Sequence, residues 1–122
     1  MDLSVENLPV LTSKQVDGKY TLLGGGELTG ESKRAWKETL YHIERFLSAD
    51  SYLISAPMWN FSIPYMLKHY IDVIVQPRYL FRYTQTGPEG LVKNKRMLIV
   101  TSRGGDYSPE SSFHHYDFQE PY

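Results

Sequence analysis

The sequence contains no cysteine, which excludes a disulfide scaffold, a thiolate metal site and a thiol nucleophile. It also lacks an excess of charge of either sign, because 13 Lys and Arg oppose 14 Asp and Glu for a formal net charge of -1. Such a chain carries no electrostatic footprint for nucleic acid or for an anionic membrane. The missing cysteines are compatible with a reducing compartment, and we expect a cytoplasmic protein.

Long hydrophobic runs are absent too. No apolar stretch approaches the roughly 20 residues that span a bilayer, and the first residues, MDLSVE, lack the basic and then apolar pattern of a secretory signal. We therefore expect a soluble protein with no membrane partner. The 122 residues are enough for one domain.

Aromatic residues are abundant, with ten Tyr, five Phe and two Trp. Tyrosine is often only partly buried, because it joins an apolar ring to a polar hydroxyl. This composition suits a site for a flat ligand or a protein interface, and an aromatic core accounts for part of it as well.

Two short apolar runs predict the centre of the fold. Residues 52–56 (YLISA) and 97–101 (MLIVT) have the length and composition of strands covered on both faces. Each run opens into a polar loop at its carboxyl end. Buried strands of this kind belong to an open α/β sheet, in which ligands bind beyond the carboxyl ends of the strands.

Helical periodicity flanks the first strand. Residues 29–48 predict one helix with Thr29 as its N-cap and an apolar stripe, and His42 beside that stripe is interpreted as a surface residue. A second helix is predicted after residue 62, with Ser62 as a candidate cap and an end before Gln76 and Pro77. The two apolar faces comprise Trp36, Leu40, Ile43 and Leu47 in the first helix and Leu67, Tyr70, Ile71 and Ile74 in the second.

Residues 1–30 show no convincing period and are interpreted as an irregular arm, which leaves residues 31–122 as the α/β core portion. The run Gly24, Gly25 and Gly26 resembles a linker more than a phosphate cradle, because no strand precedes it and no GxGxxG pattern completes it. Residues 79–92 alternate aromatic with other side chains around the turn sequence TGPEG, which predicts a hairpin-like excursion.

Residues 106–117 have neither period and predict a long loop at the carboxyl end of the second strand, a usual place for a site lid. The adjacent His114 and His115 raise the question of a metal site. Neighbouring side chains diverge, and no carboxylate or histidine spacing supports coordination, so we predict no metal.

The loops after the two strands hold the candidate chemistry. Residues 58–61 (MWNF) combine two aromatic rings with an amide and with backbone N–H groups that precede a helix. Residues 102–105 (SRGG) offer glycine backbone that a ring can approach closely, with a positive field from Arg103. Together the loops describe a site for a flat polar cofactor, and an ordinary strand-to-helix turn with a Gly-Gly loop is the plainer alternative.

Five segments closely resemble the FMN-dependent NADH azoreductases, a family of quinone reductases with a flavodoxin-like fold. They are residues 57–64 (PMWNFSIP), 67–72 (LKHYID), 81–84 (FRYT), 87–91 (GPEGL) and 101–105 (TSRGG). The resemblance implies an open parallel sheet in which this chain supplies the central strands 3 and 4 with their flanking helices. It also implies homodimers with the flavin near the subunit interface.

The resemblance implies FMN contacts at Met58, Trp59, Asn60, Phe61, Ser102, Arg103, Gly104 and Gly105, and substrate contacts at Tyr83 and Tyr107. The implied reaction alternates on one flavin: NAD(P)H delivers hydride, and a quinone or azo compound then receives two electrons. The cofactor carries the redox chemistry, so no protein acid or base is assigned a catalytic role.

Family members also have a first strand with a phosphate-binding loop and a later helix, strand and helix, which this sequence does not show. We therefore expect exposed strand edges, weak FMN binding by these residues alone, and association with further chain or with other copies. The alternative from another functional class is a non-catalytic, self-associating remnant of the same fold. A hydrolase that uses His114 and His115 ranks last, because no nucleophile motif accompanies them.

Overall fold

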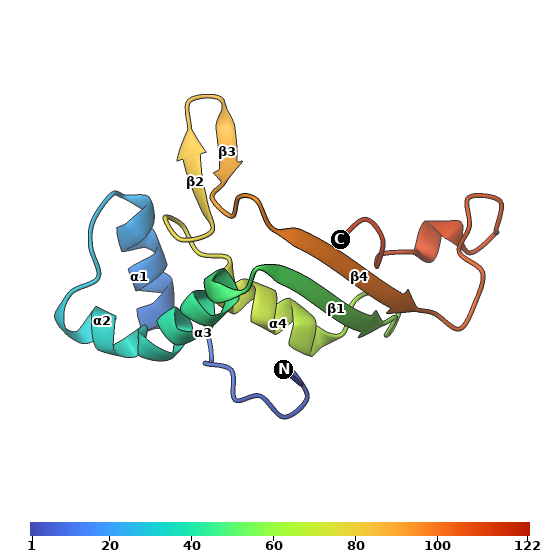
Figure 1. The fold of residues 1–122 in the computed structure, drawn as a ribbon, viewed down its shortest axis with the longest axis horizontal. Helices are drawn as coiled ribbons and strands as arrows, with labels where there is room; N and C mark the ends of the chain where they lie inside the picture. Colours follow the sequence, from blue (N-terminus) through green and yellow to red (C-terminus); the bar gives the residue numbers. More distant parts are fainter.

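The computed structural model describes residues 1–122, in which helices pack beside a two-stranded parallel sheet and a separate hairpin (Figure 1). None of the helices combines the length and the apolar character that crossing a bilayer requires. In chain order the elements are α1 (Ser13–Leu23), α2 (Gly30–Ala35), α3 (Lys37–Ser48), β1 (Ser51–Pro57), α4 (Tyr65–Ile74), β2 (Phe81–Thr84), β3 (Gly87–Gly90), β4 (Arg96–Ser102) and the 3₁₀ turn η1 (His114–Tyr116).

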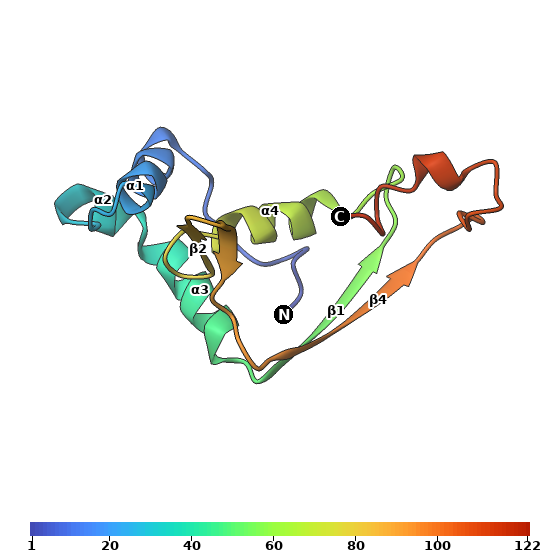
Figure 2. The ribbon, with the colours of Figure 1, turned by 90° about the horizontal axis from the view of Figure 1, so that it is seen from above.

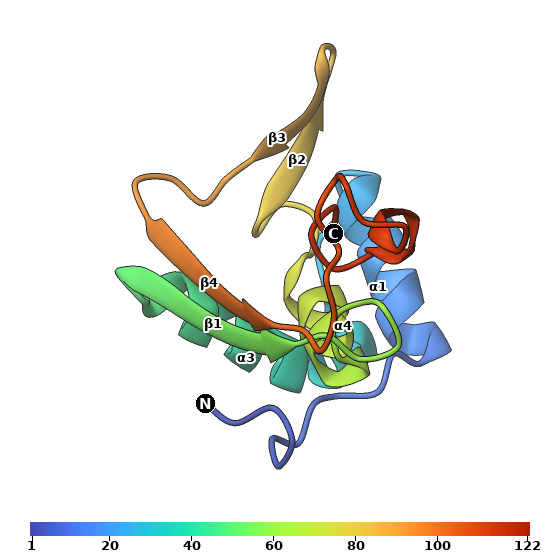
Figure 3. The same ribbon diagram turned by 90° about the vertical axis from the view of Figure 1, so that its right-hand side faces the viewer.

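The parallel sheet confirms the two strands predicted from the apolar runs. β1 and β4 pair in parallel over seven residues, from Ser51 beside Arg96 to Pro57 beside Ser102. The helices α3 and α4 lie on the same side of this sheet, as the two turned views show (Figures 2 and 3). Because the strands are parallel and in register, the loops that follow them begin at the same edge.

The core lies between α3 and α4 and not within the sheet. Ile43 from α3 packs with Tyr70, Val73 and Ile74 from α4 and with Leu80 just beyond it. The apolar stripes of the two helices therefore face each other, as their periodicity predicts. This packing fixes α4, and with it the loop that leads from β1 into α4.

The prediction of strands covered on both faces is wrong for the described residues. Every residue of β4 is exposed, and the register partners Leu53 and Leu98 are 71% and 62% exposed. The reason is that β1 and β4 pair only with each other, and the core forms between α3 and α4 and does not extend over β4. The apolar side chains of these strands form a surface suited to burial, but no described residue covers it.

The prediction of an irregular arm over residues 1–30 is also wrong, because α1 occupies Ser13–Leu23. Thr12 stands at its N-cap, and Gln15 three positions later accepts from the Thr12 N–H, the pattern of a capping box. Because Gly18 has no side chain, the buried indole of Trp36 packs directly against it. The Nε1 of this indole donates to the Gln15 carbonyl at 3.2 Å. A tertiary contact thus stabilises a helix with little amphipathic pattern.

The predicted helix over residues 29–48 is divided at Trp36 into α2 and α3, with Thr29 at the N-cap as expected. His42 was interpreted as a surface residue, and this is wrong because its side chain is buried. The rings of Tyr41 and Tyr70 lie edge-on to the imidazole, with centroids 5.2 and 6.3 Å away. His42 lies at the edge of the apolar stripe of α3, and it becomes buried because α4 packs onto that helix.

The hairpin excursion is confirmed, with β2 and β3 antiparallel and Phe81 opposite Gly90. Arg82 and Glu89 pair across it at 2.8 Å. The hairpin projects near the beginning of β4, away from the carboxyl ends of the parallel strands (Figure 1). It therefore carries Tyr83, which is exposed, away from the two candidate loops.

Candidate functional site

The two candidate loops touch where the parallel strands end. Pro57 lies beside Ser102 in the register of β1 and β4. One residue later the Met58 N–H donates to the Ser102 carbonyl at 2.7 Å. Residues 58–61 and 102–105 therefore form one continuous edge, the arrangement that a cofactor spanning two strand ends requires.

The first loop is a tight turn with exposed rings. Trp59 and Ser62 exchange two backbone hydrogen bonds, at 2.9 and 3.0 Å. Between them Asn60 and Phe61 adopt φ angles of 47° and 69°, a left-handed conformation that asparagine tolerates and phenylalanine rarely adopts. The N–H groups of Asn60 and Phe61 have no acceptor within the chain, and the rings of Trp59 and Phe61 are exposed. Such a turn presents donors and aromatic surface together.

The second loop offers open backbone. The N–H groups of Arg103, Gly104 and Gly105 have no acceptor within the chain. A β-carbon at Gly104 would meet no atom within 4 Å, and one at Gly105 would touch the ring of Tyr107 at 3.4 Å. The space beside Gly104 is therefore free for a ligand.

An aromatic cluster closes one side of this edge. The Phe61 ring lies 5.5 Å from the ring of Tyr116 and 6.4 Å from the ring of Tyr107, measured between centroids. The guanidinium of Arg103 lies 5.9 Å from the centroid of the Tyr107 ring. The structure thus places Tyr107 at the candidate site, whereas Tyr83 lies on the distant hairpin.

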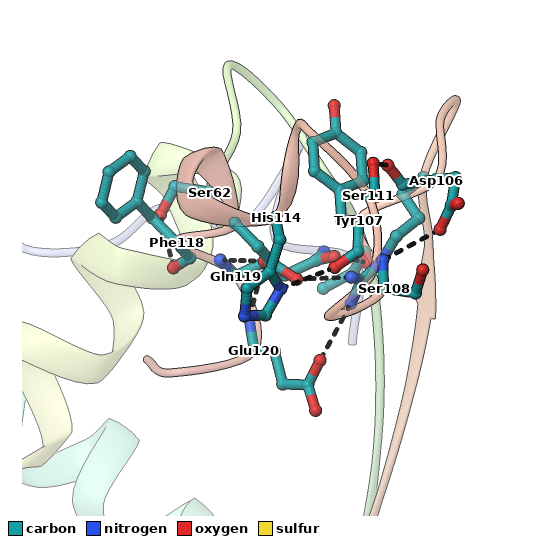
Figure 4. Close-up of polar contacts among 12 residues, drawn as sticks. Ser62, Asp106, Tyr107, Ser108, Ser111, His114, Phe118, Gln119 and Glu120 are labelled. Atoms are coloured by element: carbon teal, nitrogen blue, oxygen red, sulfur yellow. Dashed lines mark hydrogen bonds and ion pairs between the residues drawn. The ribbon is translucent and has the colours of Figure 1, made fainter.

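The loop predicted over residues 106–117 is held by its own polar groups (Figure 4). The Ser108 N–H donates to the Asp106 carboxylate at 2.9 Å, and the Ser111 hydroxyl donates to the Asp106 carbonyl at 2.7 Å. The bond from Ser108 lowers the pKa of Asp106 below its ordinary value. His114 Nδ1 pairs with the Tyr107 carbonyl at 2.9 Å. No group of three His, Cys, Asp or Glu side chains is placed to hold a metal ion.

Three successive residues that carry no motif in the sequence tie the two loops together. We call Asp117, Phe118 and Gln119 the crossing segment. Its Phe118 N–H donates to the Phe61 carbonyl at 2.9 Å, and the Gln119 amide donates to the Ala56 carbonyl at 3.1 Å. The Ser62 hydroxyl, interpreted from sequence as a helix cap, donates instead to the Phe118 carbonyl at 3.3 Å (Figure 4), and Pro64 occupies the N-cap of α4.

Asp117 anchors the crossing segment to the second loop. Its Oδ2 accepts from Arg103 Nη1 at 2.5 Å, and its Oδ1 accepts from the N–H groups of Gln119 at 2.9 Å and Glu120 at 3.2 Å. Burial acts to raise the pKa of Asp117, but these N–H groups and the guanidinium outweigh it and hold that pKa below its ordinary value. The positive field expected from Arg103 is therefore largely balanced. No spacing or composition marks Asp117, since its partner lies 14 residues earlier.

The comparisons with known proteins identify the family. The sequence pattern of a family described as having a flavodoxin-like fold matches residues 1–122. The chain belongs to this flavodoxin-like family. Its parallel sheet with flanking helices is thus part of a flavodoxin-like α/β fold, as predicted.

Relatives in this flavodoxin-like family carry names that describe one activity. An FMN-dependent NADH:quinone oxidoreductase from Desulfotalea psychrophila is 42% identical over 108 residues, which are 88% of this chain and 51% of the relative. One of the same name from Ruegeria pomeroyi is 39% identical over 120 residues, covering 93% of this chain and 59% of the relative. The chain thus spans between half and three fifths of their length.

Solved structures agree over the whole chain. The azoreductase from Bacillus anthracis strain Sterne is 32% identical with a TM-score of 0.85, and the match covers all of this chain and 58% of that one. An FMN-dependent NADH-azoreductase from Bacillus anthracis strain Ames Ancestor, in complex with FMN, is 30% identical over the same shares with a TM-score of 0.81. The flavodoxin-like assignment therefore holds in sequence and in three dimensions.

Proposed function

We propose that the protein is an FMN-dependent NAD(P)H oxidoreductase that reduces quinones or azo compounds. The observation that carries the proposal is the contact between residues 58–61 and 102–105, which gathers free backbone donors and aromatic rings at one edge of the sheet. The names of the relatives supply the cofactor and the substrate classes. When bound, FMN accepts a hydride from NAD(P)H, which leaves as NAD(P)⁺, and passes two electrons to the acceptor.

The residues present fit the ring of FMN. An isoalloxazine edge carries carbonyl and nitrogen acceptors, and the free N–H groups of Asn60, Phe61, Gly104 and Gly105 are matching donors. The open space beside Gly104 gives the ring access to that backbone. The proposed contact set is the one expected from sequence, namely Met58, Trp59, Asn60, Phe61, Ser102, Arg103, Gly104 and Gly105.

Substrate recognition is assigned to two tyrosines. Tyr107 lies beside Phe61 and Arg103, so its ring can bound the position of a flat substrate stacked on the cofactor. Tyr83 lies on the distant hairpin, so its proposed contact with substrate requires the hairpin of a second copy. We accordingly propose a homodimer, and the exposed apolar faces of β1 and β4 also favour association. We further propose a cytoplasmic location, with which the absence of cysteine is compatible.

The experiment that tests this function begins with the colour of the purified protein after excess FMN has been added. We expect protein-bound flavin absorbance bands that are bleached by NADH without oxygen and restored by a quinone. Gly104→Val is the sharp variant, because a β-carbon at this position meets no protein atom within 4 Å and the added side chain occupies the space proposed for the ring. We expect FMN affinity to fall by about tenfold or more, which corresponds to about 1.4 kcal/mol or more.

The control is Gly90→Val in the hairpin, where an added β-carbon also meets no atom within 4 Å. This variant should bind FMN as the parent does. A protein that neither contains FMN nor takes it up would contradict the proposed function. Equal FMN affinity in both variants and the parent would remove Gly104 from the contact set.

A further inference from the structure

The crossing segment gives Arg103 a partner that determines what electric field the second loop presents. The Arg103 side chain is 25% exposed, and its Nη1 lies 2.5 Å from a carboxylate oxygen of Asp117, whose side chain is 3% exposed. A second carboxylate, that of Glu120, lies 4.0 Å from Nη2 and is 79% exposed. The inner pair is shielded from water, whereas the outer one is screened by it.

The inner pair lies on the second loop, whose backbone is proposed to contact the cofactor. Arg103 is followed by Gly104 and Gly105, whose N–H groups are free. Its guanidinium lies 5.9 Å from the centroid of the Tyr107 ring, and a β-carbon on Gly105 would touch that same ring at 3.4 Å. A positive charge at this place favours a neighbour that gains negative charge, and a carboxylate in contact with it cancels that field. A pair buried to this extent also leaves a poorly compensated charge when one partner is removed.

We propose that Asp117 is a positioning residue that holds Arg103 and cancels its charge, and thereby sets the reduction potential of the flavin bound beside Gly104 and Gly105. The proposal rests on the proposed function. The reduced ring carries one more negative charge than the oxidised ring, because hydride adds two electrons and one proton. With the guanidinium neutralised, that charge is stabilised chiefly by the backbone N–H groups of the two loops.

The test is the two-electron midpoint potential of bound FMN at pH 7, measured on the full protein by equilibration with a reference dye. Asp117→Asn leaves Arg103 charged and unpaired, so the potential should become less negative. Arg103→Gln leaves the Asp117 carboxylate, still bonded to the N–H groups of Gln119 and Glu120, so the potential should become more negative. The double variant carries neither charge and should return close to the parent.

The expected size follows from the affinity of reduced relative to oxidised FMN. Each single variant should change that ratio by about tenfold, which is about 30 mV for a two-electron couple. Glu120→Gln is the matched control, since it removes the water-screened carboxylate and should move the potential much less. Asp117→Glu retains the charge beside Arg103 and should keep the potential near that of the parent.

Opposite shifts in the two single variants support the inference, because a loop that is merely loosened would shift both potentials in the same direction. Shifts of the same sign, or no shift while FMN stays bound, overturn it and leave the proposed function intact. A parent protein that binds no FMN overturns the proposed function and the inference together. If Asp117→Asn does not fold, the double variant and Arg103→Gln decide the sign, since a double variant that stays as negative as Arg103→Gln contradicts charge cancellation.

Discussion

Asp117 shows how one side chain can acquire its properties from partners far along the chain. It is an ordinary acidic residue in the sequence, yet in the fold it accepts from two backbone N–H groups and from Arg103. Those contacts favour its ionised form and hold its pKa below the ordinary value of 3.8, despite burial that acts in the opposite direction. Its contribution to stability therefore depends on pH.

Acid should remove that contribution. Because the pKa of Asp117 is lower in the folded than in the unfolded chain, its stabilising effect is complete above the unfolded value of 3.8 and is lost as the pH falls through the lower folded value. We expect the free energy of unfolding, measured by urea titration at a series of pH values, to decrease below about pH 4 more steeply in the parent than in Asp117→Asn.

Asp2, Glu31, Glu89 and Asp106 also have lowered pKa values and remain in both proteins, so the difference between the two curves isolates Asp117. Parallel curves would show that Asp117 does not carry the expected acid sensitivity. The comparison requires no cofactor, so it examines the contacts of the crossing segment independently of flavin binding.

At the scale of elements, α1 is the least expected part of the fold. Its sequence has little amphipathic pattern, and its closest packing contact places the buried indole of Trp36 against the backbone at Gly18. A β-carbon placed at Gly18 would lie only 2.2 Å from Nε1 of that indole. The glycine is therefore required by packing and not by a turn.

Gly18→Ala tests this contact. In an exposed helix interior, replacing Gly by Ala typically stabilises by about 0.5–1 kcal/mol. Here the clash with Trp36 should reverse the sign, and we expect a net loss of about 1–3 kcal/mol in unfolding free energy, typical of overpacking. The measurement is urea denaturation followed by tryptophan fluorescence.

The matched control is Asp17→Ala, one residue earlier on the exposed side of α1. It adds helix propensity without a new contact and should leave stability unchanged or slightly raised. A Gly18→Ala protein as stable as the parent would show that α1 can shift away from Trp36 at little cost.

At the scale of the whole molecule, the main feature is a parallel sheet whose apolar face is exposed. β1 and β4 pair with each other alone, and Leu53 and Leu98 are adjacent, apolar and largely exposed. Paired strands with free edges and an apolar face associate readily in water. The described residues thus form a site at one end of a sheet whose outer face is suited to further burial.

The 122-residue chain studied by itself should therefore associate. We expect multi-angle light scattering to give a mass above that of one 14.2 kDa chain at micromolar concentration. Leu98→Lys should shift the distribution toward the monomer, because it places a charge at the centre of the apolar face.

Val5→Lys makes the same change at an exposed residue outside the sheet and should have no such effect. A monodisperse parent monomer that unfolds cooperatively would contradict the expected association. If both lysine variants reduce association equally, net charge and not the face of the sheet is responsible.

The sequence by itself determined the elements whose signals are local. Apolar runs fixed β1 and β4, helical periodicity fixed α3 and α4, and the turn sequence fixed the hairpin, so the two candidate loops could be placed at one sheet edge. The motifs that resemble the azoreductase family predicted FMN as the cofactor. These inferences succeed because the composition of a strand, the apolar stripe of a helix and the residues of a tight turn are patterns of residues close together in the chain.

Only the tertiary structure decided what depends on distant partners. It buried His42 beneath Tyr70, docked α1 through Gly18 against Trp36, and brought Asp117 to Arg103. It also left the apolar strands exposed, because composition states what a strand can bury but not which element covers it. Burial, ion pairing and the field at the candidate site are properties of contacts, and contacts between remote residues have no local pattern in the sequence.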